Sequence, residues 1–353
     1  MRIASEVWNS EAGWAVLSRA LLAPAALLYR AGSGMRNAMY DRGLLPIAVA
    51  PIPVISIGNL AVGGTGKTPV SAWMAAELRA RGARPAIVMR GYGDDEPGVH
   101  ALLNPGIPVV AKADRIAAVQ DAATAGANVA VLDDGFQHRR LSRLEDVVLV
   151  SADRWHEPIR VLPSGPWREL PTALSRASMV MVTRKAADAP RAGALLQQLA
   201  PMTRTGAGAV AVLELGDLRH VVTGAARPLS DIRGTVVLAA AGIGDPASLA
   251  SQLRETGASV DLRRFPDHHV YDSSDIAQLA HDARNFDHVI CTLKDAVKLR
   301  PRWPREAPPL WYVSLRCRIE VGSADVSAML DRVLAARPTH IRQARTGQRL
   351  HDT

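Results

Sequence analysis

The chain has 353 residues, of which 48% are hydrophobic and 22% charged, with a formal net charge of +8 and a pI near 10.0. This composition is that of a folded protein, and the length favours two domains. Two cysteines are too few for a disulfide framework or a zinc cluster, so we expect a reducing compartment. The positive charge favours an acidic partner such as a nucleotide or an anionic membrane, whereas only 4% aromatic residues argue against a base-stacking platform, and we expect no nucleic-acid partner.

Residues 1–45 combine tryptophan and leucine with arginine. The uninterrupted apolar run from Ala20 to Tyr29 is too short to cross a bilayer, and no convincing small-residue cleavage site follows it. Such a composition is typical of an amphipathic helix that lies in the headgroup region of an anionic leaflet. The alternative is a helix packed on its own protein, and the pattern leaves both open.

A glycine-rich loop that ends in Gly66-Lys67-Thr68 follows an apolar run at 54–57. Glycines let such a loop turn its N–H groups around phosphates, the lysine reaches the β- and γ-phosphates, and the threonine hydroxyl binds Mg²⁺. The strict pattern has glycine where this chain has Ala61, but the later glycines supply the flexibility. A turn without a ligand is the alternative. The predicted ATP-binding residues are Gly63, Gly64, Thr65, Gly66, Lys67 and Thr68.

Strands and helices alternate from residue 51 to about residue 150. We predict strands at 54–57, 85–89, 128–132 and 146–150, and helices at 67–81 and 113–125. Strands separated by helices form a parallel sheet, which binds ligands at the carboxyl ends of its strands.

Two adjacent carboxylates, Asp133 and Asp134, follow the third of these strands. A nucleotide-hydrolysing fold holds Mg²⁺ with a carboxylate at this point, opposite the lysine and threonine of the phosphate loop. Either aspartate could instead cap a helix. The phosphate loop earlier in the same sheet favours the metal role, so the predicted Mg²⁺ ligands are Thr68, Asp133 and Asp134.

The composition changes after residue 150, where Arg154, Arg160, Arg168 and Arg176 are spread through a proline-containing stretch. This stretch predicts a hinge and a cleft rim at which basic groups meet a substrate phosphate. The alternative is that these arginines form a solvated basic face with no ligand. Further strands are predicted within 206–223 and at 235–241, 260–265, 287–292 and 310–315, with helices at 246–254, from 294 onward and at 323–336.

The segment Asp267-His268-His269 contains two adjacent histidines. Neighbouring side chains on an extended backbone point in different directions, and no third ligand lies at a useful spacing, so we expect no metal site here. The residues alone favour a structural or solvated role for a loop histidine.

Several longer blocks keep their order over roughly residues 10–330. They read Pro53-Val54-Ile55-Ser56-Ile57-Gly58-Asn59-Leu60, Arg90-Gly91-Tyr92-Gly93, Asp133-Asp134-Gly135-Phe136-Gln137-His138-Arg139, Leu162-Pro163-Ser164-Gly165-Pro166-Trp167-Arg168-Glu169, Ala241-Gly242-Ile243-Gly244, Phe265-Pro266-Asp267-His268-His269 and Thr292-Leu293-Lys294-Asp295-Ala296-Val297-Lys298. With the phosphate loop, these blocks resemble the tetraacyldisaccharide 4'-kinase family, the lipid A 4'-kinases. Together they are far more specific than the loop alone.

The resemblance implies transfer of the γ-phosphate of ATP to the 4'-hydroxyl of tetraacyldisaccharide 1-phosphate, which gives lipid IVA in lipid A biosynthesis. The implied cofactors are ATP and Mg²⁺, and the implied partners are the acylated disaccharide 1-phosphate glycolipid and an anionic membrane surface. The implied location is the cytoplasmic face of the inner membrane, as a peripheral protein. We expect a monomer.

The resemblance also assigns roles to residues. It implies that Asp95 takes the proton from the sugar hydroxyl and that His268 assists Asp95. The third predicted catalytic residue is Lys67, which the phosphate loop itself places where it neutralises charge on the transferring phosphoryl group. Further candidates for contacting the substrate or supporting the site are Tyr92, Glu96, Gln137, His138 and Glu169. The chain departs from the family where Gly93 runs directly into Asp94-Asp95-Glu96-Pro97 without the usual insert, a shortening that could alter acceptor preference.

The predicted fold is α/β, with a P-loop NTPase-like parallel sheet covered by helices on both faces, a second smaller α/β lobe and an N-terminal amphipathic membrane-associated helix. The predicted segments are the N-terminal helix at 1–45, the nucleotide-binding domain at 46–152, the second lobe with its hinge at 153–336 and a basic, disordered tail at 337–353. The last helix, although assigned to the second lobe, could pack against the first domain.

Two other functions fit parts of the sequence. One is another P-loop ATP-dependent enzyme, such as a ligase or a metal-insertion NTPase, because the loop does not name the acceptor. GTP-specific proteins carry an Asn-Lys-x-Asp segment, which this sequence lacks. The other is a non-catalytic nucleotide-binding membrane scaffold, which has no chemical need for Lys67, Thr68, Asp95, Asp133 and Asp134 together.

Overall fold

A single sheet of 12 strands runs through the molecule in the computed structural model, which describes residues 6–8, 10–91, 95–244, 246–267 and 269–337. From one edge to the other the strands are β10 (Ser259–Arg264), β9 (Val236–Ala241), β11 (His288–Thr292), β12 (Leu310–Val321), β7 (Gly208–His220), β6 (Met179–Arg184), β5 (Glu145–Ser151), β1 (Val54–Asn59), β4 (Val129–Asp133), β2 (Pro85–Met89) and β3 (Val109–Ala111). The short β8 (Ala226–Arg227) pairs with β7.

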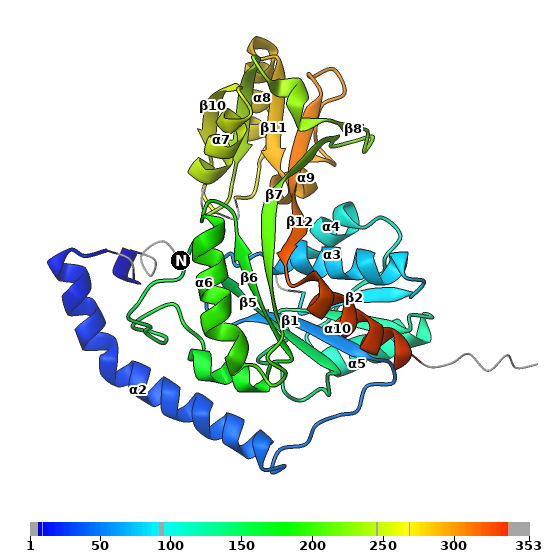
Figure 1. Cartoon of the computed structure of the whole chain (residues 1–353). Helices are drawn as coiled ribbons and strands as arrows, with labels where there is room; N and C mark the ends of the chain where they lie inside the picture. Colours follow the sequence, from blue (N-terminus) through cyan, green and yellow to red (C-terminus); the bar gives the residue numbers. More distant parts are fainter. Residues whose placement is uncertain (1–5, 9, 92–94, 245, 268, 338–353) are drawn as a thin grey trace, which may run out of the picture.

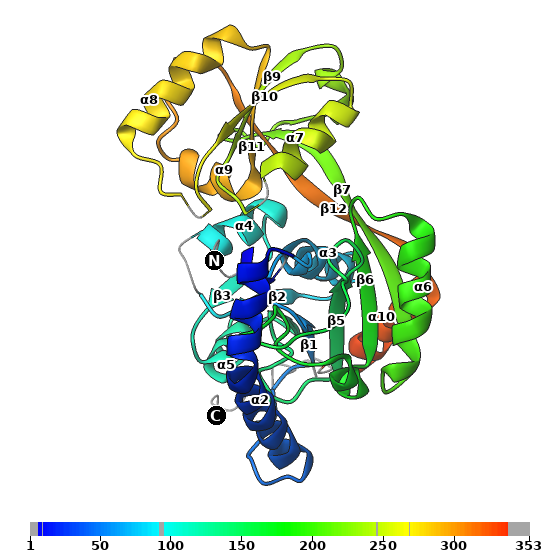
Figure 2. The same ribbon diagram turned by 90° about the vertical axis from the view of Figure 1, so that its left-hand side faces the viewer.

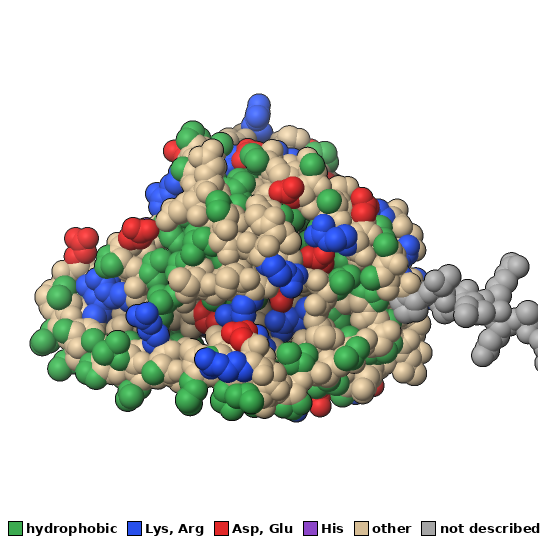
Figure 3. Space-filling model, turned by 60° about the horizontal axis from the view of Figure 1, so that its bottom comes forward, with side chains coloured by type: hydrophobic (Ala, Val, Ile, Leu, Met, Phe, Trp, Pro, Cys, Tyr) green, Lys and Arg blue, Asp and Glu red, His purple; other side chains and the backbone are tan. Residues whose placement is uncertain are grey.

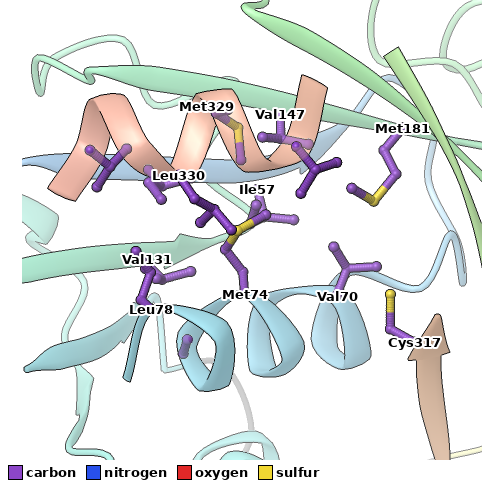
Figure 4. Packing of buried hydrophobic residues seen from close by; sticks show 14 of the residues in the cluster. Ile57, Val70, Met74, Leu78, Val131, Val147, Met181, Cys317, Met329 and Leu330 are labelled. Carbon is purple, nitrogen blue, oxygen red and sulfur yellow. The ribbon is translucent and has the colours of Figure 1, made fainter. Parts of the chain in front are cut away.

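The first lobe contains a parallel sheet made of β3, β2, β4, β1, β5, β6 and the start of β7, in that spatial order. Helices cover both faces of this sheet (Figure 1). One face carries α3 (Lys67–Ala80) and α10 (Ser323–Ala335), and the other carries α5 (Arg115–Thr124) and α6 (Ala189–Leu199). Strands buried on both faces explain the continuous apolar runs in the sequence. Figure 4 shows Met74 of α3, Met329 of α10 and Ile57 and Val131 of the sheet gathered in one apolar cluster.

The second lobe is built on β9, β10 and β11 together with the adjoining parts of β7 and β12. Helix α7 (Pro246–Glu255) covers one face, whereas α8 (Ser273–Asp282) and α9 (Leu293–Leu299) cover the other. Helix α4 (Asp95–Leu103) lies where the two lobes meet and packs against α9, as Figure 2 shows. A Cβ added at Gly98 of α4 would lie only 2.6 Å from Cγ1 of Val297, so glycine permits this close approach.

The two lobes are joined through β7 and β12, which pair antiparallel along most of their length. β7 begins beside β6 in the first lobe and ends beside β8 in the second, while β12 begins beside β11 in the second lobe. The sheet therefore does not break at the predicted boundary of residue 152, because β6 and the start of β7 extend the pairing of β5. The last helix, α10, packs in the same apolar cluster as α3.

Helix ends match local sequence signals. Asp114 accepts hydrogen bonds from the N–H groups of Ile116 and Ala117, so α5 begins two residues later than predicted. Asp272 and Asp275 form a reciprocal capping box at the start of α8. Short 3-10 turns occur at Pro171–Arg176, Ala200–Met202, Leu229–Ile232 and Ala283–Asn285. The predicted disordered tail falls, apart from Arg337, outside the described residues.

The N-terminal helix α2 (Gly13–Asp41) lies along the outside of the first lobe and contains Pro24 (Figures 1 and 2). It leaves large apolar side chains in solvent: Trp14, Val16, Leu17, Leu21, Leu27, Leu28 and Met35. Figure 3 shows apolar side chains along this edge with basic side chains beside them. None of the helices in the described part of the chain reaches the length and apolarity that crossing a membrane requires.

Candidate active site

The phosphate loop lies between β1 and α3, at the carboxyl edge of the first-lobe sheet. Buried Asn59 donates a hydrogen bond of 2.9 Å from Nδ2 to Oγ1 of Thr65, and Thr183 donates one of 2.9 Å from Oγ1 to the Thr65 carbonyl oxygen. Gly66 precedes α3 with a φ of 87°, a left-handed conformation that favours glycine. The base of the loop is thus held by side chains, while its exposed glycines adjoin the positive end of α3, where phosphate binds favourably.

Asp133 is the last residue of β4, the neighbour of β1. Its two carboxylate oxygens differ in their hydrogen bonding. Oδ2 accepts a hydrogen bond of 2.8 Å from Nε2 of His100, a fully buried side chain on α4. Oδ1 is buried and has no hydrogen-bond partner within the described residues. Because an unpartnered buried carboxylate oxygen is costly, a cation or a water bound to it is the expected occupant.

Asp134 has a φ of 58°, which is uncommon for a residue with a side chain. Nη1 of Arg168 lies 2.9 and 3.1 Å from its two oxygens, and Nζ of Lys67 lies 3.7 Å from Oδ1. Burial opposes ionisation of Asp134, but the charges of Lys67 and Arg168 outweigh it and hold the pKa below its usual range. Basic groups therefore engage Asp134, and Asp133 is the better-placed carboxylate for a cation.

A polar network holds the end of β1, from which the phosphate loop starts. Gln137 donates from Nε2 to the Asn59 carbonyl oxygen at 2.8 Å and to Oε1 of Glu169 at 3.2 Å. Oε2 of Glu169 accepts hydrogen bonds from Nδ2 of Asn37 at 2.8 Å and from Nη2 of Arg176 at 2.7 Å. Since Asn37 lies on α2, this network joins the N-terminal helix to the end of β1.

The four arginines predicted at the cleft rim divide into two pairs. Arg168 and Arg176 form ion pairs with Asp134 and Glu169, so their charges are already matched within the protein. For these two arginines the structure therefore shows neither a simple solvated basic face nor charges left over for a substrate phosphate, because each is paired with a carboxylate. Arg154 and Arg160 are exposed.

Three of the predicted site residues cannot be placed in the site. Tyr92 and His268 lie outside the described residues, and of Asp95 only the backbone is described, at the start of α4. Glu96 follows in the first turn of that helix and is half-buried. Thr68 lies in the first turn of α3, next to Lys67.

His138 lies beside the network, with its Nε2 buried and unpartnered among the described residues. Burial, together with the positive charges of Arg115 and Arg143, lowers its pKa from 6.5 to about 4. At neutral pH this imidazole is therefore uncharged.

Sequence reasoning missed His100 and Asn37. His100 follows Asp95 by five residues, and no local motif distinguishes it from an ordinary core histidine, because its partner Asp133 lies 33 residues away. Asn37 sits among the residues of an apolar helix, and its partner Glu169 lies 132 residues away. Only the tertiary fold brings these pairs together.

The residues present fit a magnesium ion that is held jointly with phosphates. No group of three or more His, Cys, Asp or Glu side chains able to hold a metal ion occurs in the part of the chain that the structure describes. Mg²⁺ in nucleotide sites takes one or two protein ligands and completes its shell with phosphates and water. The unpartnered oxygen of Asp133 and the hydroxyl of Thr68 meet that requirement.

Comparison with known proteins gives consistent matches over nearly the whole chain. A family model described as tetraacyldisaccharide-1-P 4'-kinase matches residues 18–335. The tetraacyldisaccharide 4'-kinase of Anaeromyxobacter dehalogenans (strain 2CP-1) is 37% identical over 93% of this chain and 94% of its own length. That of Halorhodospira halophila is 39% identical over 89% and 94%. The crystal structure of LpxK from Aquifex aeolicus in complex with ATP matches with a TM-score of 0.70 and 26% identity, over 89% of this chain and 99% of that one.

Proposed function

The chain belongs to the tetraacyldisaccharide 4'-kinase family, and from that membership we propose how its own residues carry out the reaction. It is a lipid A 4'-kinase, which transfers the γ-phosphate of ATP to the 4'-hydroxyl of tetraacyldisaccharide 1-phosphate. One observation carries the residue-level proposal: Lys67 of the phosphate loop lies 3.7 Å from Asp134, and the adjacent Asp133 keeps one buried oxygen without a partner among the described residues.

The phosphates of ATP bind to the loop from Gly63 to Thr68, at the positive end of α3. Lys67 neutralises negative charge on the transferring phosphoryl group, and Asp134 keeps its ammonium group beside the loop. Thr68 and Asp133 would hold Mg²⁺, which neutralises phosphate charge when it is bound.

Asp95, assisted by His268, accepts the proton of the sugar hydroxyl. A sugar hydroxyl has a high pKa, so a carboxylate acts mainly by positioning the hydroxyl and by late proton transfer. Support comes from the family motifs and from the backbone, since α4 begins at Asp95 and packs against α9 of the second lobe.

The apolar side of α2 binds a membrane surface, which brings the kinase to its acylated substrate. Trp14, Leu21, Leu28 and Met35 recur at spacings of seven residues, which places them on one side of the helix, and each is at least half exposed. Exposed arginines on the same segment suit an anionic leaflet. We place the protein as a peripheral monomer on the cytoplasmic face of the inner membrane.

Transfer of labelled γ-phosphate to tetraacyldisaccharide 1-phosphate in detergent micelles tests the proposal, with the wild type compared with Lys67→Ala and Asp95→Ala. We expect product from the wild type alone. Asp95→Ala should lower kcat much more than it weakens ATP binding, and an equal loss of both would count against its role as the base. A wild type that hydrolyses ATP without labelling the glycolipid would contradict the acceptor assignment and direct attention to the shortened loop after Tyr92.

A further inference from the structure

Arg154 lies in the turn after β5, directly beside the phosphate loop. β5 pairs in parallel with β1, so the segments that follow the two strands meet at the same edge of the sheet. A Cβ added at Gly63 would lie 2.5 Å from Nη1 of Arg154, so the guanidinium occupies the space that any side chain at position 63 would need. Gly63 also has a φ of 117°, which only glycine adopts readily.

The backbone on both sides of Arg154 is anchored. The carboxylate of Asp153 accepts three hydrogen bonds of 2.6 to 2.8 Å, from the N–H groups of Lys185, Ala186 and Ala187. Trp155 packs edge-on against Trp167 with ring centroids 5.2 Å apart. The side chain of Arg154 therefore extends toward the loop from a fixed turn, so the backbone that carries it does not have to be ordered when a ligand binds.

Among the residues that the structure describes, Arg154 has no carboxylate partner, whereas Lys67, Arg168 and Arg176 each have one. Lys67 and Arg168 share Asp134, and Arg176 pairs with Glu169. The guanidinium of Arg154 is exposed and forms no hydrogen bond or ion pair with any other residue that the structure describes. An unmatched guanidinium held against a phosphate-binding backbone is suited to bind phosphate oxygens, because its planar fork can donate two parallel hydrogen bonds.

We propose that Arg154 is a further catalytic residue, which donates hydrogen bonds to the oxygens of the transferring phosphoryl group of ATP. The proposal rests on the kinase function stated above. In the transfer, the sugar oxygen bonds to the γ-phosphorus, the bond from phosphorus to the β–γ bridging oxygen breaks with its electron pair leaving on ADP, and the hydroxyl proton passes to Asp95. Arg154 keeps its proton throughout and stabilises the negative charge that spreads over the phosphoryl oxygens, as arginines do in other phosphoryl-transfer enzymes.

The test compares Arg154→Ala and Arg154→Lys with the control Arg204→Ala. Arg204 is an exposed arginine shortly before the amino end of β7, whereas the phosphate loop lies at the carboxyl ends of the parallel strands. We expect Arg154→Ala to lower kcat at least about 100-fold. Arg154→Lys should recover part of that loss, since a lysine restores the charge but not the fork. The control should match the wild type.

A second measurement requires no acceptor. Binding of ADP with aluminium fluoride, which imitates the phosphoryl group in transfer, is compared with binding of ADP alone, both with magnesium. Arg154→Ala should weaken the first about as much as it lowers kcat and leave the second little changed. Equal affinities of wild type and Arg154→Ala for ADP with aluminium fluoride would overturn the proposal.

The phosphate of the acceptor glycolipid offers Arg154 the same chemistry. If Arg154→Ala raised only the KM for the glycolipid, the guanidinium would belong to the 1-phosphate of the acceptor, and the proposal would be wrong. A wild type that bound ADP with aluminium fluoride but never labelled the glycolipid would instead contradict the kinase function, while the binding comparison still decided the role of Arg154.

Discussion

His100 gives the carboxylate of Asp133 a fixed orientation. Its hydrogen bond of 2.8 Å to Oδ2 holds the carboxylate, so that the unpartnered Oδ1 keeps one direction. Both groups are buried, which limits competition from bulk solvent for this hydrogen bond. The same helix begins at Asp95, so α4 orients the carboxylate that we propose to hold the cation and also carries the proposed base.

Replacing His100 tests this orientation. His100→Gln keeps an N–H donor at a similar distance along the side chain, whereas His100→Leu removes the donor and keeps an apolar volume. We expect His100→Leu to raise the magnesium concentration needed for binding of a fluorescent ATP analogue by about 10- to 100-fold, with His100→Gln much closer to the wild type. Equal losses in both variants would show that packing of the imidazole matters and not its hydrogen bond.

His138 predicts a pH dependence of stability. An unfolded histidine takes up a proton as the pH falls through about 6.5, but the folded protein keeps His138 neutral until about pH 4. The stabilisation from this neutral imidazole is complete above pH 6.5 and is lost as the pH falls toward 4. In urea unfolding, His138→Gln should therefore show a smaller drop in midpoint between pH 6.5 and 4.5 than the wild type, and equal drops would contradict the assignment.

At the scale of elements, α2 offers the clearest surface to test. Leu21 and Leu28 are 73% and 75% exposed, although burying a leucine side chain is worth about 1.5–3 kcal/mol. The double variant Leu21→Gln, Leu28→Gln should bind vesicles containing anionic lipid roughly tenfold or more weakly, while ATP binding stays unchanged. Val222→Gln with Val270→Gln is the control, because these exposed apolar residues lie in the second lobe. Similar losses in both double variants would exclude a specific role for α2.

The elements of the first lobe were predictable because the signals are local. β2 was predicted at its observed bounds, since a strand buried on both faces reads as an unbroken apolar run. β12 was expected to end at Leu315 but continues to Val321. In that half, exposed Arg316 and Arg318 flank buried Cys317, and this alternation of a partly solvated antiparallel strand does not resemble an apolar run.

The site shows the same division. The phosphate loop and Asp133 could be located from the sequence because they lie at the carboxyl ends of β1 and β4, neighbouring strands of one parallel sheet; their roles stay predictions. Contacts between distant segments could not be located in this way: His100 with Asp133, Arg154 with Gly63, and Asn37 with Glu169 each require the packed fold.

At the scale of the whole molecule, the contact between α4 and α9 joins the lobes. Gly98→Ala would place a Cβ 2.6 Å from Cγ1 of Val297, which should push α9 away from α4 and lower both the transfer rate and the thermal midpoint. Val297→Ala removes both Cγ atoms, so the double variant should recover much of the loss. We expect a coupling free energy of about 0.5–3 kcal/mol between the two changes. Simple additivity would show that this contact does not set the position of α9.

The packing of α10 has a consequence for how the protein is made. Val326, Met329, Leu330 and Val333 complete the apolar cluster under α3, the helix that begins at the phosphate loop. A ribosome that has released the chain only as far as β11 has exposed the nucleotide loop but not the helix that covers its core. The N-terminal half therefore cannot reach its final packing ahead of the rest during synthesis, as independent domains do. A nascent chain that stops before α10 should expose apolar surface and depend on chaperones until translation ends.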